Sequence, residues 1–178
     1  MLLLKLLMMA NDKLSIYETE RVLFPFILRF YYTEKKLIRI AFLHGKKNDQ
    51  KFPQNCLQNH FPEWLINAMH QIQAYLLGQQ KIFQIPYSWS AIANPLYLRS
   101  MQYLAEIPYG SVISYESFAR MANLSSARHA GKVLSENPLP MIIPCHRVIR
   151  KDGSTGGFTP DLSIKRYLLA LESSVCHV

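Results

Sequence analysis

Residues 144–147 read Pro-Cys-His-Arg and lie within an apolar run that covers residues 141–149. A run of this kind is typical of a buried segment, so the fold has to enclose a thiol and an imidazole side by side. A thiol reacts as its thiolate, and a neighbouring imidazole is a common means of generating one. The alternative is a buried structural cysteine, and only the flanking segments distinguish the two interpretations.

The composition is that of a globular chain with a basic surplus. Of the 178 residues, 49% are apolar and 18% are charged, which suits one or two small domains with a real core. The net charge of +8 favours a polyanionic partner such as nucleic acid or an anionic membrane, although a merely soluble basic protein is the simpler alternative. The apolar start, residues 1–10, is too short to span a bilayer and lacks the features of a signal peptide. We therefore expect a soluble, cytoplasmic protein.

The cysteines do not suggest a disulfide framework. Cys56, Cys145 and Cys176 are odd in number and far apart, which fits a reducing cytosol. Cys56 and His60 are four residues apart, but no second pair has the spacing of a structural zinc site. We predict no metal site and no cofactor.

The first half of the sequence predicts a small α/β unit. Residues 21–32 and 36–43 are rich in β-branched and aromatic side chains and predict two strands. Apolar residues at helical spacing then predict a helix over residues 64–76, with Gly78 as its stop. A short strand is expected within residues 81–90.

The second half of the sequence predicts helices. Pro95 can open the first, Ser114 can cap the second, and Ser125 or its neighbour can cap the third. The last two, joined by a short turn, have the outline of a helix-turn-helix unit. With a closing helix near the C-terminus, these elements predict a second domain over residues 91–178. It follows an N-terminal domain over residues 1–90.

The third of these helices carries a face of small side chains. Ala127, Gly131 and Ser135 stand at positions i, i+4 and i+8. Close helix packing inside the protein would explain such a face. Because Arg128 and His129 flank it and the chain is basic, we favour close approach to a DNA groove.

Four segments of the second half occur in a characteristic order. They read Ile107-Pro-Tyr-Gly-Ser-Val-Ile-Ser-Tyr115, Ala127-Arg128, Asn137-Pro-Leu-Pro-Met-Ile-Ile-Pro-Cys-His-Arg-Val-Ile149, and Lys165 with Leu168-Leu-Ala-Leu-Glu172. Together they resemble the O6-alkylguanine-DNA alkyltransferase family, also called methylated-DNA–protein-cysteine methyltransferases. The resemblance covers residues 93–172. It implies an N-terminal α/β domain with a small antiparallel, ribonuclease H-like sheet and an all-α C-terminal domain with a helix-turn-helix.

The resemblance also implies a reaction. Cys145 would irreversibly take a methyl or alkyl group from O6 of guanine, and also from O4 of thymine. His146 would accept the thiol proton through a water, Glu172 would orient His146, and Asn137 would bridge the helix and the active-site segment. We expect a methylated-DNA–protein-cysteine S-methyltransferase for DNA repair that is used once, acts as a monomer, and needs no obligate protein partner.

The implied partner is double-stranded DNA that contains O6-alkylguanine. A base atom inside a duplex cannot meet a buried thiolate in line, so the base would be flipped out through the minor groove. Tyr115 would press on the 3′ phosphate, and Arg128 would fill the gap in the stack, beside the face of Ala127, Gly131 and Ser135. Backbone carbonyls at Cys145 and Val148 would read the guanine amino group. The expected substrate pocket comprises Pro140, Val148, Phe158 and Thr159.

Several positions depart from the family pattern. Phe158 stands where the family generally has Tyr, which removes a hydroxyl near the guanine O6. Pro160-Asp161 replaces a usual Gly-Gly, so the pocket loop should be stiffer and accept a different range of alkyl groups. The loop between Tyr115 and Arg128 is about one residue shorter. The zinc-ligating cysteines of some members' N-terminal domains have no matching set here.

Three other functions have distinct signatures. A binding module that flags alkylated bases would lack the reactive cysteine, so Cys145 argues against it. A helix-turn-helix regulator would need a defined operator sequence. A cysteine hydrolase would release product repeatedly.

Overall fold

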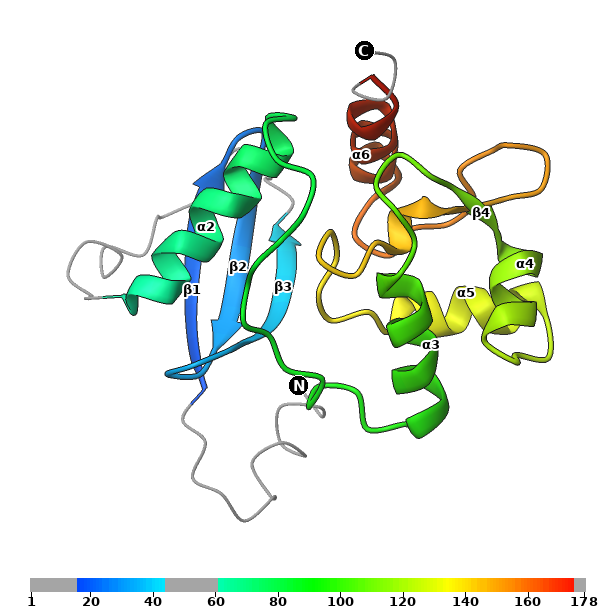
Figure 1. Cartoon of the computed structure of the whole chain (residues 1–178), viewed down its shortest axis with the longest axis horizontal. Helices are drawn as coiled ribbons and strands as arrows, with labels where there is room; N and C mark the ends of the chain where they lie inside the picture. Colours follow the sequence, from blue (N-terminus) through cyan, green and yellow to red (C-terminus); the bar gives the residue numbers. More distant parts are fainter. Residues whose placement is uncertain (1–15, 44–60, 175–178) are drawn as a thin grey trace.

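The computed structural model describes residues 16–43 and 61–174. Its first half is a three-stranded antiparallel sheet in the order β1 (Tyr17–Leu23), β2 (Phe26–Tyr32), β3 (Leu37–Leu43). Helix α2 (Glu63–Leu76) packs across one face of the sheet (Figure 1). The predicted small antiparallel sheet and the predicted helix are confirmed, whereas the ribonuclease H-like assignment stays a prediction.

Two strand predictions need correction. The single strand expected over residues 21–32 is two strands, because Leu23 pairs with Phe26 across a tight turn at Phe24 and Pro25. Proline has no N–H for a ladder, so the apolar run could not continue as one central strand. The strand expected within residues 81–90 is wrong, since Tyr87 forms only an isolated bridge with Leu37.

The sheet and α2 form the core of the first half through two different periodicities. In β2 every second residue, Leu28, Phe30 and Tyr32, is buried. In α2 the buried side chains recur three and four residues apart, as expected for one face of a helix. They are Leu65, Ala68, Met69, Ile72, Tyr75 and Leu76.

The second half contains four helices among the described residues: α3 (Pro95–Ala105), α4 (Tyr115–Met121), α5 (Ala127–Ser135) and α6 (Leu162–Ser174). Side-chain oxygens accept from backbone N–H groups at the starts of the first three; the caps predicted for α4 and α5 are confirmed, and the cap of α3 is a residue that the sequence analysis did not name. The capping residues are Asn94, Ser114 and Ser126.

The second half is not purely helical, so that part of the all-α expectation is wrong. A two-residue strand β4 (Ile113–Ser114) pairs in parallel with β5 (Val148–Ile149). The 3₁₀ turn η2 (Cys145–Arg147) precedes β5 directly. This pairing fixes the Pro-Cys-His-Arg segment next to the chain that enters α4.

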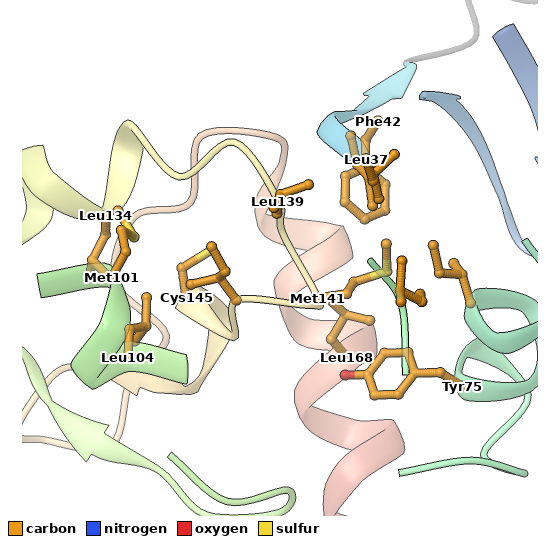
Figure 2. Close-up of a cluster of buried hydrophobic side chains, with 14 of the residues drawn as sticks. Leu37, Phe42, Tyr75, Met101, Leu104, Leu134, Leu139, Met141, Cys145 and Leu168 are labelled. Atoms are coloured by element: carbon orange, nitrogen blue, oxygen red, sulfur yellow. The ribbon is translucent and has the colours of Figure 1, made fainter. Parts of the chain in front are cut away.

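The two halves share buried contacts. The Ile40 amide of β3 donates to the Pro138 carbonyl at 2.8 Å, and the Tyr167 hydroxyl of α6 donates to the Leu76 carbonyl at the end of α2 at 2.7 Å. Figure 2 shows apolar side chains from both halves in one continuous cluster. The boundary between residues 90 and 91 stays a prediction. Within the described residues, no helix is long and apolar enough to cross a membrane.

Candidate active site

Cys145 lies at the start of η2 and is only 5% exposed. In Figure 2 its side chain belongs to the buried cluster, facing the helices that carry Met101 and Leu134. The amide nitrogen of Asn137 donates to its Sγ atom at 3.0 Å. Burial raises the pKa of the Cys145 thiol to about 11, although the Asn137 donor and the Lys165 charge act against this rise. The resting thiol is therefore protonated at neutral pH and needs a base to react.

His146 is fully buried and pairs with Glu172. Its Nε2 lies 2.9 Å from Oε1 of the carboxylate. Because an ionised carboxylate only accepts hydrogen bonds, Nε2 carries the proton, and the lone pair of the neutral ring is on Nδ1. Nδ1 has no hydrogen-bond partner among the described residues. Burial lowers the pKa of His146, so the neutral ring is available as a base at neutral pH.

Glu172 is 2% exposed and is surrounded by donors. Arg147 donates from Nε to Oε2 at 2.9 Å and from Nη2 to Oε1 at 2.8 Å. The Tyr75 hydroxyl reaches Oε1 at 2.6 Å, and the Gly110 amide reaches Oε2 at 3.1 Å. Burial alone would raise the pKa of Glu172, but these donors together with His146 hold that pKa well below its usual range.

A cavity of about 1010 Å³ opens beside Cys145. Its walls come from α5, from the segment before η2 and from the loop before α6. Of the residues predicted for the site, His146, Val148 and Glu172 do not line it, and each of the three is 2% exposed or less. The predicted residues that do line the cavity are Tyr115, Ala127, Arg128, Gly131, Ser135, Asn137, Pro140, Cys145, Phe158 and Thr159.

Lys165 donates hydrogen bonds to the backbone at one wall of this cavity. Its buried ammonium donates to the Val148 carbonyl at 2.7 Å and to the Gly157 carbonyl at 3.3 Å. It also lies 5.4 Å from the ring centroid of Tyr115 and 5.9 Å from that of Phe158, within the range of cation–π attraction. Burial lowers the pKa of Lys165 to about 8.

Gly156 allows Tyr115 to lie flat against the pocket loop. An ideal Cβ at this position would lie 2.7 Å from Cε2 of the Tyr115 ring, and φ is +66°. Both the contact and the left-handed backbone require glycine. The Tyr115 hydroxyl then donates to the Gly157 carbonyl at 3.0 Å.

Sequence reasoning missed four contributions. Tyr75, Arg147 and Gly110 converge on Glu172, and strand β3 contributes Arg39 and its neighbours to the cavity wall. Arg147 stands inside the Pro-Cys-His-Arg segment, so its burial within an apolar run was a usable signal. The others come from distant parts of the chain, and local pattern carries no sign of them.

Among the described residues, no group of three or more His, Cys, Asp or Glu side chains could hold a metal ion. Cys56 and His60, the pair considered for zinc, lie outside the described ranges.

Residues 95–174 match the family model described as the DNA-binding domain of 6-O-methylguanine DNA methyltransferase. A methylated-DNA–protein-cysteine methyltransferase from Methanosarcina acetivorans is 34% identical over 143 residues, which cover 79% of this chain and 88% of that protein. One from Pyrobaculum aerophilum is 42% identical over 78 residues, and this match spans 44% of the chain and about half, 52%, of the relative.

Solved structures agree with the sequence relatives. The crystal structure of Mycobacterium tuberculosis O6-methylguanine methyltransferase superposes with a TM-score of 0.73 at 26% identity, covering 90% of this chain and 94% of that one. A structure of Mycobacterium tuberculosis OGT in complex with DNA gives a TM-score of 0.66 at 25% identity, covering 84% and 88% of the two chains.

Proposed function

The chain belongs to the 6-O-methylguanine DNA methyltransferase family, whose members are methylated-DNA–protein-cysteine methyltransferases, and on that premise we propose that Cys145 accepts an alkyl group from O6 of guanine in DNA. The predicted family and enzyme class are confirmed. The observation that carries the proposal is the buried Cys145 thiol at the wall of a cavity. The next residue, His146, has no hydrogen-bond partner for Nδ1 among the described residues, so this nitrogen is available to accept a proton.

The proposed reaction is a single displacement at the alkyl carbon. His146 takes the thiol proton through a water, and Sγ of Cys145 forms a bond to carbon as the bond between carbon and O6 breaks. The electron pair stays on guanine, which then takes up a proton. Glu172 stabilises the imidazolium, as the hydrogen bond of 2.9 Å between them supports. The thioether product is inert, so each molecule acts once.

We propose that DNA lies along α5. The small face of Ala127, Gly131 and Ser135 lines the cavity, and the exposed Arg128 side chain stands at the cavity wall. A duplex lying there would deliver a base to Cys145 only if the base left the stack, with Arg128 filling the gap and Tyr115 pressing on the 3′ phosphate. In this proposal α4 and α5 act as a helix-turn-helix.

Substrate choice follows from the pocket walls. We propose that O6-alkylguanine is the main substrate and that O4-alkylthymine is also accepted. The Phe158 ring offers no hydroxyl to the substrate oxygen, and Pro160 lies in the wall where the family has glycine, so the rate on large alkyl groups should differ from that of family members with Tyr and Gly-Gly. We also propose a cytoplasmic monomer with no obligate protein partner.

Intact-mass spectrometry on the protein mixed with a duplex that contains O6-methylguanine tests the reaction. We expect an increase of one methyl group per molecule, located on the peptide with Cys145, and no increase in Cys145→Ser. Well-folded protein that binds the duplex but gains no methyl group would favour the binding-module hypothesis. Release of several product molecules per protein would favour a hydrolase.

A further inference from the structure

Tyr75 connects the first half of the chain to the proposed proton relay. It is fully buried near the end of α2, and Figure 2 shows its hydroxyl pointing toward α6. That hydroxyl donates to Oε1 of Glu172 at 2.6 Å and lies 3.3 Å from Nε2 of His146. The two bonded residues are 97 positions apart in the sequence.

We propose that Tyr75 is a positioning residue, through which the N-terminal half holds the Glu172 carboxylate in the orientation that keeps the lone pair of His146 on Nδ1. This inference rests on the proposed function of Cys145. It gives α2 a part in the reaction in addition to its part in the core.

Both oxygens of the Glu172 carboxylate accept hydrogen bonds that limit its rotation. Tyr75 and His146 both donate to Oε1, while the Gly110 amide holds Oε2. Burial and the Glu172 charge raise the pKa of Tyr75, so the hydroxyl keeps its proton and remains a donor over the whole working range of pH. Without it, one constraint on carboxylate rotation is lost.

The Tyr75 hydroxyl also reduces the effect of the Glu172 negative charge on His146, because it donates to the same carboxylate oxygen. The charged groups that affect the pKa of the His146 ring are Glu172 and Lys165 on α6 and Arg147 in η2. The Tyr75 hydroxyl contacts the ring from α2. The Tyr75 bond is one of those that lower the pKa of Glu172. When that donor is removed, the negative charge on Oε1 is less shared, and the imidazolium form of His146 becomes more favourable. The pKa of His146 should then rise.

Tyr75→Phe keeps the buried ring and removes only the hydroxyl. We expect the single-turnover rate constant for methyl transfer to fall about tenfold at pH 7, as for the loss of one buried hydrogen bond to a charged group. The acid limb of the pH–rate profile should move to higher pH, because the ring must be neutral to accept a proton.

Tyr167→Phe is the matched control. It removes a hydroxyl from the same contact between α2 and α6, where Tyr167 donates to the Leu76 carbonyl at 2.7 Å, but it leaves Glu172 untouched. We expect its rate and pH profile to match those of the unmodified protein. Equal changes in both variants would mean that Tyr75 acts only through packing of α2 on α6. A Tyr75→Phe protein with the original rate and profile would also overturn the inference.

The titration of His146 followed by NMR of its ring nitrogens separates this inference from the proposed function. A higher pKa of His146 in Tyr75→Phe, with the original value kept in Tyr167→Phe, supports the role of Tyr75 even if no methyl transfer occurs. An unchanged His146 pKa in folded Tyr75→Phe contradicts it. Absence of methyl transfer by the unmodified protein would contradict the proposed function alone.

Discussion

The side-chain amide of Asn137 joins Cys145 to the chain that leads to it. Its nitrogen lies 3.0 Å from Sγ of Cys145 and donates to the Ile143 carbonyl at 2.8 Å. Its oxygen accepts from the Leu139 amide at 3.0 Å. One planar group therefore closes the turn after α5 and also offers a donor to the sulfur.

Asn137→Ala should lose both functions. We expect a loss of about 1–3 kcal/mol in the free energy of unfolding, because buried backbone groups lose their partner. The methyl-transfer rate should fall by about tenfold or more, since the thiolate loses a donor. Denaturant titration and single-turnover kinetics measure the two effects. Asn94→Ala, which removes the cap of α3, should cost about 1 kcal/mol and leave the rate unchanged.

Glu172→Gln should make the protein unstable at neutral pH but less sensitive to acid. The variant leaves the buried Arg147 guanidinium without a charged partner, which costs about 3–5 kcal/mol. In the unmodified protein the pKa of Glu172 lies below its unfolded value of about 4.3, so its stabilisation is present above that pH and is lost as the pH falls below it. Denaturant titrations at pH 7 and pH 3 test this difference, with Glu106→Gln at an exposed position as the control. An equal acid dependence in both variants would contradict the assignment.

Lys165→Met should separate activity from stability. The rate of methyl transfer at pH 7 should fall about tenfold, because the Lys165 charge lowers the pKa of the Cys145 thiol. The net change in stability at pH 7 should be small, because the relief from burying an ammonium whose pKa is lowered to about 8 is offset by the loss of its hydrogen bonds to the Val148 and Gly157 carbonyls. In the unmodified protein that lowered pKa makes stability rise with pH from about 8 to about 10.4, and the variant should lack this rise. Arg166→Met, at an exposed position on α6, should keep both the rate and the rise.

Gly156→Ala should disturb the wall of the pocket. Its Cβ would push on the Tyr115 ring, so the hydrogen bond from Tyr115 to the Gly157 carbonyl should weaken and methyl transfer should slow. Gly153→Ala is a close match, because φ is +82° there and, apart from the neighbouring residues in the chain, no atom of the described residues lies within 4 Å of the added carbon. Both variants should lose about 1–2 kcal/mol to backbone strain. Only Gly156→Ala should lose rate, and equal rates in the two would contradict a role for the ring position.

Methylation of Cys145 should destabilise the protein. The added carbon enters a site where Cys145 is 5% exposed and the Asn137 nitrogen lies 3.0 Å from its sulfur. Overpacking of this size costs about 1–3 kcal/mol and should lower Tm by roughly 3–10 °C. Calorimetry before and after reaction with the methylated duplex measures the shift. Cys145→Ser treated in the same way should show none, and an unchanged Tm in fully methylated protein would contradict the prediction.

The sequence was most informative where the determinants are local. The caps at Asn94, Ser114 and Ser126 and the helical spacing of apolar residues specify α3, α4 and α5 without reference to distant segments. The site was predictable only in part, through Cys145 and its neighbours. A glutamate near the end of a helix is usually solvated, so Glu172 gained weight only from the family resemblance, and the structure buries it.

The remaining parts of the site depend on tertiary contacts. Tyr75 is one apolar position among six in the buried face of α2, and nothing in the spacing separates it from Ile72 or Leu76. Its hydroxyl meets Glu172 only because the C-terminal end of α2 comes within side-chain reach of α6. The same holds for Arg39, whose strand reaches the cavity because the Ile40 amide binds the Pro138 carbonyl.

The contact between α2 and α6 has a consequence for how such chains can be recombined. A chimera that joined the second half of this chain to the first half of a relative would have to bring a phenol to the same place above Glu172, along with a partner for Tyr167. Without the phenol, the hybrid would retain the thiol and the imidazole but lose one constraint on the Glu172 carboxylate; without the partner for Tyr167, it would lose a contact that joins the halves but not the orientation of that carboxylate. Compatibility of the two halves therefore depends on two matched hydroxyl groups as well as on the shared apolar core, and α2 and α6 should be exchanged together.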